Sequence, residues 1–409
     1  MRSEIAMPDA KIEVFADTKQ FLGMPLAQFL RDHWQKRPLL VRNAFPDFVA
    51  PLMPEDLAGL ACEETALSRI VSHDAKSDTW ELRSGPFAES EFPVMPHQDW
   101  TLLVQDVDKW DGDVATLLAH FDFLPRWRID DVMVSFAAPG GSVGAHVDQY
   151  DVFLLQGQGR RRWQIDSGPN PPTAFRDDVE LKLLREFHPD HEWVLEPGDM
   201  LYLPPGVPHH GVALDACLTF SIGMRAPARS ELLLDFAEFL AERLPETQRY
   251  ADPDLAAVQD SGEIDAAALA RAAVALAPFS PADPATLRDW FGRFITRYRS
   301  AGDVVAPPRP PTPTQISTRL AAGATLHQHP FSRFAWARSD RGAELFVDGE
   351  SHPCSVACAR RLSDATALDA AAYATLDAPG RALLHDLCVL GCFALSRAPK
   401  MPIPRKRPS

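Results

Sequence analysis

The residues best placed to do chemistry are a histidine and an aspartate in the stretch GAHVDQYDVFLLQG. His146 and Asp148 lie two positions apart, directly before an apolar run, and residues two apart on a β-strand point to the same face. One more histidine would place two imidazoles and a carboxylate on one side of a metal ion. That facial arrangement leaves coordination positions open and is typical of non-haem Fe(II) oxygenases. The pair therefore predicts an iron site with room for a keto acid and dioxygen.

Two other pairs in the chain have the same H-x-D spacing, so the spacing alone is a weak signal. His97 and Asp99 lie in PHQDW, and His188 and Asp190 lie in HPDHEW. Both stretches are polar and flanked by proline, which is typical of loops rather than core strands. Only the pair at 146 and 148 leads into an apolar strand, and we therefore prefer it.

The third ligand is expected in EPGDMLYLPPGVPHHG, which resembles the second motif of the cupin superfamily. Two adjacent histidines compete there, and His209 directly follows Pro208, where that motif places its ligand. For a single histidine, an ordinary hydrogen-bonded side chain would be the simpler explanation. Because an H-x-D pair precedes it in the chain, we predict that His209 rather than His210 binds the metal.

An arginine inside the same element points to a cosubstrate. After the turn from Gly157 to Gly159 we expect the chain to return as an antiparallel strand, with Trp163 and Ile165 facing inward. Alternation then places Arg161 inward as well, and the arginines on either side outward. A buried guanidinium needs an anion, and its planar fork matches a carboxylate. The distal carboxylate of 2-oxoglutarate is such an anion.

The elements that must position these residues follow from the periodicity of the chain. The 409 residues predict two or three domains. FLGMPLAQFLRDHW (21–34) has the spacing of an amphipathic helix, and short runs with period two between 126 and 225 are separated by Gly/Pro turns, which is typical of a sandwich or barrel. Residues 230–300 return to a helical pattern. A proline-rich spacer, APPRPPTPT (306–314), then precedes a small α+β segment in which FAWAR and ELFVDGE form a hairpin.

Composition limits the partners of the protein. The formal net charge is −15, from 56 acidic and 41 basic residues, which argues against general nucleic-acid binding and suits a basic partner or simple solubility. The chain has no apolar run of membrane-spanning length and no signal-peptide pattern at its start, so we expect a cytoplasmic protein without a membrane anchor.

Four of the six cysteines form two pairs with a spacing of four, Cys354/Cys358 and Cys388/Cys392. That spacing places each pair on one face of a helix. We interpret these cysteines as small core residues rather than as a zinc site, which more often uses a spacing of three on a tight turn.

Two long motifs resemble a known family. DDVMVSFAAPGGSVGAHVDQYDVFLLQGQGRRRW and LEPGDMLYLPPGVPHHGVAL are similar to the bacterial ribosomal oxygenases of the JmjC (cupin) class, specifically those that hydroxylate an arginine of a large-subunit ribosomal protein. WQKRPLLVRNAF and PRWRIDD also fit. The resemblance implies an α+β protein with a double-stranded β-helix (JmjC/cupin jelly roll) at 1–228, a helical dimerisation region at 229–302, a linker at 303–314, a winged-helix domain at 315–399 and a basic tail at 400–409.

The same resemblance implies roles for individual positions. Iron ligands correspond to His146, Asp148 and His209, and cosubstrate contacts to Arg161 and Ser135. The pocket for the target arginine corresponds to Asp131, Met133, Tyr150 and Ser221. Parity agrees, since 131, 133 and 135 share one strand face. His210 stands where an acidic residue is expected.

The implied function is hydroxylation of the β-carbon of an arginine in a basic ribosomal protein, with Fe(II), 2-oxoglutarate and O2, by a homodimer. The C-terminal segment has no dense basic face, so we expect no direct DNA binding. Three alternatives stay open: a histidyl hydroxylase or demethylase of the same class, a winged-helix regulator with an inactive cupin, and a non-redox metal cupin such as an isomerase. Asp131 beside Tyr150 favours a guanidinium over an imidazole, and Arg161 argues against the isomerase.

Overall fold

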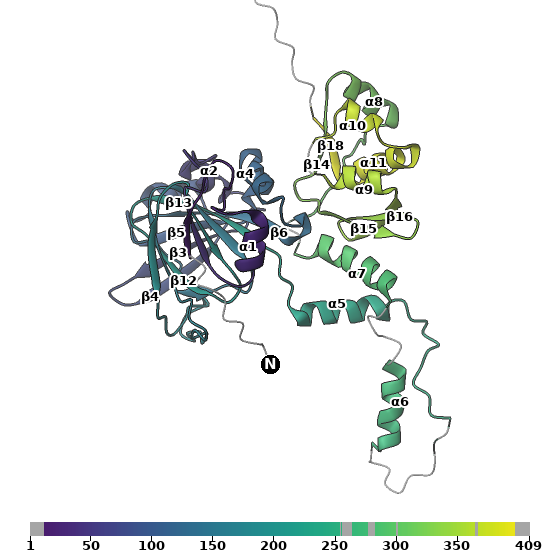
Figure 1. Ribbon diagram of the computed structural model, residues 1–409, viewed down its shortest axis with the longest axis horizontal. Coiled ribbons are helices and arrows are strands. Elements are labelled where there is room, and N and C mark those ends of the chain that lie inside the picture. The colour runs from purple at the N-terminus through teal and green to yellow at the C-terminus, as the bar shows by residue number, and fades with distance from the viewer. Residues whose placement is uncertain are drawn as a thin grey trace, which may run out of the picture. The chain divides into compact units, whose positions relative to one another are not determined.

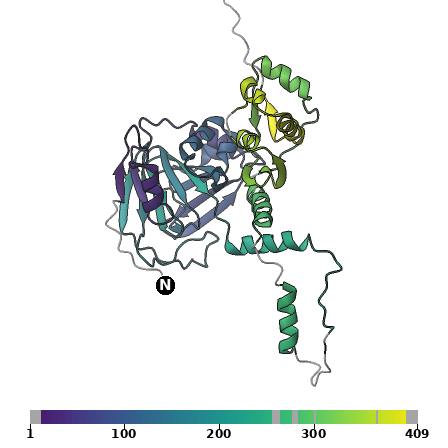
Figure 2. The ribbon, with the colours of Figure 1, turned by 45° about the vertical axis from the view of Figure 1, so that its right-hand side comes forward.

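The computed structural model describes residues 12–253, 255, 264–276, 283–299, 302–364 and 367–396. It divides into two compact units, Met1–Ala226 and Pro227–Ser409, which are coloured purple to teal and green to yellow in Figures 1 and 2. The expected basic tail at 400–409 lies outside the described residues. Within the described ranges, every helix is too short or too polar to cross a membrane.

The first unit is a sandwich of two sheets, as expected for a jelly roll. The larger sheet has the order β1-β2-β11-β8-β13-β6-β5-β3-β4, and the smaller has the order β10-β9-β12-β7. The strands of the larger sheet are β1 (Glu13–Phe15), β2 (Leu39–Arg42), β3 (Ser68–Asp74), β4 (Thr79–Ser84), β5 (Trp100–Val104), β6 (Ile129–Ala137), β8 (Val152–Gln158), β11 (Met200–Leu203) and β13 (Cys217–Met224). Those of the smaller sheet are β7 (His146–Val147), β9 (Arg161–Ile165), β10 (His191–Leu195) and β12 (Pro208–Ala213).

The two faces of the larger sheet have different coverings. Its outer face carries the main apolar core, with side chains such as Val132, Phe153 and Phe220 packed against α1 (Leu26–Asp32) and α2 (Pro54–Leu60). The short helices α3 (Val107–Trp110), α4 (Gly112–Thr116), η2 (Leu117–Phe121) and η3 (Arg126–Arg128) follow β5, and η1 (Glu89–Val94) precedes it. The inner face turns toward the smaller sheet, where a second apolar cluster fills one end. The outer face thus supplies most of the packing, and the inner face is left for polar residues.

The helix expected at 21–34 is shorter than the sequence pattern suggested. It begins at Leu26 after Pro25 and ends at Asp32. Gly23 has a φ of 65°, a left-handed conformation that interrupts a right-handed helix, and proline has no N–H to continue one from its N-terminal side. The residues before Pro25 therefore form turns, although Leu22 is fully buried.

The expected antiparallel pairing of the two strands around Gly159 is wrong. β8 lies between β11 and β13 in the larger sheet, whereas β9 lies between β10 and β12 in the smaller one. Gly159 has a φ of 64°, and a Cβ there would lie 2.2 Å from the carbonyl oxygen of Ala216. This glycine lets the chain cross from one sheet to the other instead of folding back. Arg161 nevertheless points inward, as expected, because its direction depends only on alternation within β9.

The second unit begins with three helices, α5 (Arg229–Ala241), α6 (Ala266–Leu276) and α7 (Pro284–Arg297). The remainder packs helices α8 (Pro313–Ala321), α9 (Val356–Ser363), α10 (Ala370–Ala374) and α11 (Ala378–Leu390) with short strands around one apolar core. The expected hairpin is confirmed as β15 (Phe334–Ser339) and β16 (Gly342–Val347), extended by β17 (Glu350–Cys354); β14 (Leu326–Gln328) pairs with β18 (Phe393–Leu395).

Two details of this unit differ from expectation. Thr312 caps α8, so Pro313 and Thr314 form its first turn rather than the end of a spacer. The cysteine pairs do not share helix faces. Cys354 ends β17 while Cys358 lies in α9, and Cys392 follows the turn that ends α11. All four contribute to the apolar core of the unit.

Candidate metal centre

Three side chains converge at one end of the first unit's sandwich. Among the described residues, one group of three or more potential metal ligands comes together, and it consists of His146, Asp148 and His209. His146 belongs to β7, Asp148 follows it directly, and His209 lies opposite His146 on the neighbouring strand β12. The ligand atoms all lie within 4.8 Å of one another. The structure therefore brings together the three residues that the sequence motifs predict as metal ligands.

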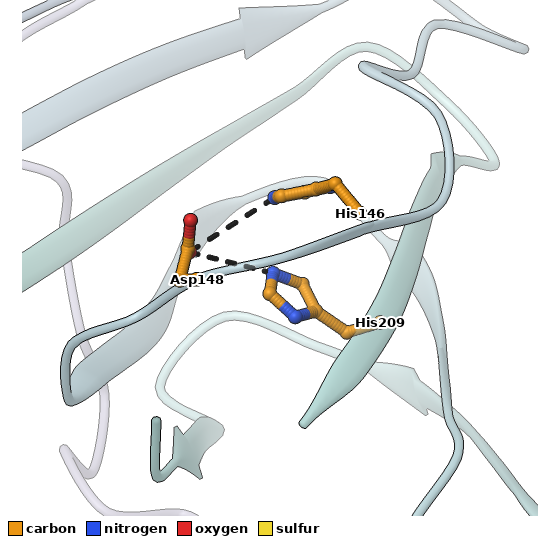
Figure 3. Close-up of side chains that lie close together, drawn as sticks. All are labelled: His146, Asp148 and His209. Carbon is orange, nitrogen blue, oxygen red and sulfur yellow. Dashed lines mark ion pairs between the residues drawn. The ribbon is translucent and has the colours of Figure 1, made fainter. Parts of the chain in front are cut away.

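The geometry of the trio suits a single ion. The Nε2 atoms of His209 and His146 lie 3.7 and 4.0 Å from Oδ2 of Asp148, and Figure 3 shows both rings turned toward that carboxylate. Metal bonds of about 2.0–2.2 Å place two ligand atoms of one ion no more than about 4.4 Å apart. Two imidazoles and one carboxylate are the donor set of non-haem Fe(II) sites, so the residues present fit iron.

Hydrogen bonds fix the orientation of both imidazoles. Nδ1 of His146 lies 2.9 Å from the carbonyl oxygen of Gly144, and Nδ1 of His209 lies 3.0 Å from that of Val207. Since a carbonyl only accepts, each Nδ1 carries the proton and each Nε2 keeps its lone pair for a metal. Burial and the nearby His146 ring lower the pKa of His209 to about 4. The His209 imidazole is therefore neutral at physiological pH, as a ligand must be.

The competing histidines lie elsewhere. His210 alternates away from His209 along β12 and packs edge-on against Phe187. His97 is exposed in a loop, and His188 is exposed beside Glu186. These positions leave His209 as the member of the HH pair that meets Asp148.

Arg161 occupies the interior of the sandwich without an acidic partner. It is 3% exposed, and its Nη1 donates at 3.4 Å to the hydroxyls of Ser135 and Thr219 on the opposite sheet. Its Nη2 donates at 3.4 Å to the carbonyl of Gly211, and its Nε has no acceptor. Desolvation lowers the pKa of this guanidinium. A buried cation with only long, neutral contacts is costly, and an incoming carboxylate would relieve that cost.

Sequence reasoning missed two residues of this pocket, Thr219 and Gln156. Thr219 lies opposite Ser135 in the β13–β6 register and donates at 3.2 Å to Gln156 of β8. Both are almost fully buried. The available signal was a polar residue at an inward-facing position of a mostly apolar strand. The outward arginine, Arg160, pairs with Asp215 at the surface, as expected.

The residues expected to line a substrate pocket lie on neighbouring strands. Met133 and Ser221 are paired across β6 and β13, and Asp131 is paired with Gly223 two residues further along. Desolvation, helped by the carboxylates of Asp106 and Asp130, raises the pKa of Asp131 to about 7. Its Oδ2 accepts the backbone N–H of Asp106 at 3.1 Å. A cationic side chain would stabilise the ionised form of this carboxylate.

Tyr150 is influenced by one candidate metal ligand and by Asp131. The residue is 38% exposed, and the pKa of its phenol is raised by desolvation and by the carboxylates of Asp148 and Asp131. Its phenol is therefore close enough to interact electrostatically with both carboxylates. All nine residues singled out from the sequence are located on or beside the inner faces of the two sheets.

Family models match parts of both units. Residues 116–232 match the model of the JmjC domain, and residues 280–393 match that of the ROXA-like winged helix. Residues 187–293 match an AraC-like ligand binding domain.

Individual relatives extend the agreement over most of the chain. The chain is 39% identical to the ribosomal protein uL16 3-hydroxylase of Escherichia coli over 306 residues, covering 73% of this chain and 78% of the relative. It is 42% identical over 208 residues to a protein of Haemophilus influenzae named probable ribosomal oxygenase, with half of each chain covered. The crystal structure of E. coli YcfD aligns with a TM-score of 0.81 at 34% identity, covering 92% of this chain and 99% of that one. A further YcfD structure, in complex with cobalt and 2-oxoglutarate, aligns with a TM-score of 0.78 at 33% identity and the same coverage.

Proposed function

The chain belongs to the family of JmjC-domain ribosomal oxygenases, and we propose that it hydroxylates the β-carbon of an arginine in a protein of the large ribosomal subunit. As a member of this family the enzyme is a 2-oxoglutarate-dependent oxygenase that uses Fe(II) and dioxygen. The observation that carries the proposal is the pairing of a facial His-Asp-His set with a buried arginine that has no acidic partner. The substrate follows from the uL16 3-hydroxylase named above.

Bound iron supplies the activation of dioxygen that converts 2-oxoglutarate to succinate and carbon dioxide and replaces a C–H bond of the substrate by C–OH. His146, Asp148 and His209 would hold it. The protein contributes position: Arg161 orients the cosubstrate through its distal carboxylate, and the enclosing sheets exclude water from the reacting groups. The apolar side chains at one end of the sandwich support this second role.

On the substrate side, Asp131 and Tyr150 bind the guanidinium of the target arginine. Desolvation and the nearby carboxylates of Asp106 and Asp130 raise the pKa of Asp131, and arginine, which stays charged at all relevant pH values, would stabilise its ionised form. Met133 and Ser221 lie on the same stretch of the sheet and line the aliphatic part of the side chain. The site thus favours a long cation over an imidazole.

The test uses purified protein with Fe(II) and 2-oxoglutarate, and large-subunit ribosomal proteins from a strain that lacks this gene. Hydroxylation of one arginine, detected by tandem mass spectrometry, is the expected result. Modification of a histidine, or loss of a methyl group from lysine, would replace the arginine assignment by one of the two rival activities of the same class. Absence of succinate formation with every ribosomal protein would contradict the proposal.

For quaternary structure we propose a homodimer formed by the helices between 229 and 302. Phe236 and Phe239 of α5 are buried within the chain, with Phe236 against Trp290. Large exposed apolar residues in this region include Leu233 and Leu234 of α5 and Leu269, Val274 and Leu276 of α6. No side chain of α6 is buried. Contact with a second copy of the chain would bury these exposed apolar side chains. Sedimentation at micromolar concentration should give a dimer, and a monomer would contradict this.

For the C-terminal domain we propose protein contacts, not DNA contacts. Several of its arginines pair with acids or backbone carbonyls in the structure, including Arg361 with Asp364 and Arg333 with the carbonyl of Tyr298. Duplex binding requires several free cations on one face and depends steeply on salt. An electrophoretic shift assay with the full chain at physiological salt should show no complex with random duplex. A tight, salt-sensitive complex would revive the regulator hypothesis.

A further inference from the structure

Trp163 lies between the metal ligands and the buried arginine. It is the central residue of β9, with Arg161 on one side and Ile165 on the other, and all three face the interior of the sandwich. The centre of its ring is 5.9 Å from that of His209, and Cζ of Arg161 lies 5.0 Å from the indole ring. A molecule that reaches from the metal site to Arg161 must therefore pass beside this indole.

The indole N–H has no acceptor. Trp163 is 4% exposed, and its Nε1 is buried without a hydrogen-bond partner. Trp163 belongs to the second apolar cluster with Leu154 and Leu201, whose side chains offer no acceptor. Buried indole N–H groups usually find a partner. Because an indole nitrogen only donates, the missing partner must be an acceptor.

The packing of the ring shows which edge is free. Gly211 lies opposite Trp163 in the β12–β9 register, and a Cβ on Gly211 would lie 2.8 Å from Cη2 and Cζ3 of the indole and 2.8 Å from Nε of Arg161. The six-membered ring is therefore pressed against the backbone of β12. The N–H is on the opposite edge of the ring system, away from this contact. Arg161 Nε is a second buried donor without an acceptor beside the same glycine.

We propose that the Trp163 N–H donates a hydrogen bond to a carboxylate oxygen of bound 2-oxoglutarate, which makes Trp163 a cosubstrate-binding residue beside Arg161. The proposal rests on the proposed function, since it assigns one more contact to the same cosubstrate. It explains why two donors, on Trp163 and Arg161, are left without acceptors in one interior. A dicarboxylate that reaches both groups supplies oxygen acceptors, whereas an apolar ligand supplies none.

The test is Trp163→Phe, which keeps an aromatic ring but removes the N–H donor together with the rest of the five-membered ring. Calorimetric titration of Mn(II)-loaded protein with 2-oxoglutarate should show affinity about tenfold weaker than that of the unsubstituted protein. Mn(II) affinity should stay within about twofold, because Trp163 is not a ligand. The matched control is Trp193→Phe, since Trp193 is paired with Trp163 from β10 but packs beside His191. That variant should bind 2-oxoglutarate normally.

Unchanged 2-oxoglutarate affinity in Trp163→Phe, with Arg161→Ala weakened in the same assay, would overturn the proposal and leave the proposed function intact. Failure of the unsubstituted protein to bind 2-oxoglutarate would overturn both. If the phenylalanine variant does not fold, replacement of Trp163 by benzothienylalanine, which has sulfur in place of the N–H, repeats the experiment at nearly constant volume. Normal affinity in that variant would also overturn the proposal.

Discussion

The two faces of the larger sheet use the same strands for different purposes. On β6, β8 and β13 the residues that point outward are Val134, Leu155 and Ile222, all buried in the main core. Their immediate neighbours, including Ser135, Gln156 and Ser221, point inward and are buried although they are polar. One face is therefore stabilised by apolar burial, and the other holds buried polar groups beside the second apolar cluster. Adjacent residues of each strand therefore serve either stability or function. Substitutions on the outer face should lower the free energy of unfolding, whereas substitutions on the inner face should lower activity or ligand binding.

The largest effect is expected from Asp148→Ala on the inner side. It removes the one anionic ligand of the trio, so succinate formation should fall more than about 100-fold. The free energy of unfolding of the metal-free protein should change by no more than about 1 kcal/mol, because this residue is outside the apolar core. His209→Ala should also be inactive, and His210→Ala, the matched control, should be active. An inactive His210→Ala beside an active His209→Ala would reverse the ligand assignment.

Phe153→Ala on the outer face should instead have its main effect on the free energy of unfolding. Phe153 is fully buried among the aromatic rings of Phe29, Phe121 and Tyr202. Its truncation should cost about 3–5 kcal/mol in urea denaturation. The matched substitution on the inner face, Ser221→Ala, should cost less than about 1 kcal/mol. Equal destabilisation by Phe153→Ala and Ser221→Ala would show that the outer face does not contribute more to stability than the inner face.

Arg161→Ala should separate the cosubstrate from the metal. Loss of a buried charge-assisted pair costs about 2–5 kcal/mol, so 2-oxoglutarate binding should weaken by that amount while Mn(II) binding stays nearly unchanged. Separate titrations of the two ligands measure this. Arg160→Ala, whose guanidinium pairs with Asp215 at the surface, should leave both affinities unchanged. Equal weakening of both ligands in Arg161→Ala would mean that the arginine is structural.

A smaller, pH-dependent effect is expected at Asp131. Its pKa is raised to about 7 by desolvation and by nearby acids, above the value of about 4 in the unfolded chain. Between these values the folded protein holds the extra proton, so its stability falls as the pH rises through that window. Binding of an arginine peptide requires the carboxylate and should instead strengthen as the pH rises toward 8.

Asp131→Asn should remove both trends. The variant should be at least about 1 kcal/mol more stable at pH 8 than the unsubstituted protein, and its peptide affinity should be weak and independent of pH. Thermal melts and peptide titrations at pH 5 and 8 check this. An unchanged pH profile of peptide binding would show that Asp131 is not the group that meets the guanidinium.

The metal site was predictable because its signals are local. His146 and Asp148 have the spacing of one strand face and lead directly into an apolar run, and His209 has its place after Pro208 in a recognisable motif. The inward direction of Arg161 needed only alternation within one strand. Thr219 and Gln156 could not be assigned in this way. Each is a polar residue in an apolar strand, and its role appears only when the opposite strand is known.

Other differences arose where local rules allow two outcomes. A turn with two glycines fits a hairpin, yet Gly159 carries the chain into the other sheet. A spacing of four fits one helix face, but Ser355 caps α9 after Cys354, which leaves that cysteine in the preceding strand. In both cases tertiary packing decided between conformations that the sequence permits equally.

The most direct test of the central claim is the fate of labelled dioxygen. The purified protein is incubated with Fe(II), 2-oxoglutarate, large-subunit ribosomal proteins and isotopically labelled O2, and the substrate is fragmented by tandem mass spectrometry. The account predicts one labelled oxygen atom on the β-carbon of a single arginine, equimolar succinate, and neither product with Asp148→Ala. Succinate without labelled substrate, label on a residue other than arginine, or an active Asp148→Ala variant would contradict it.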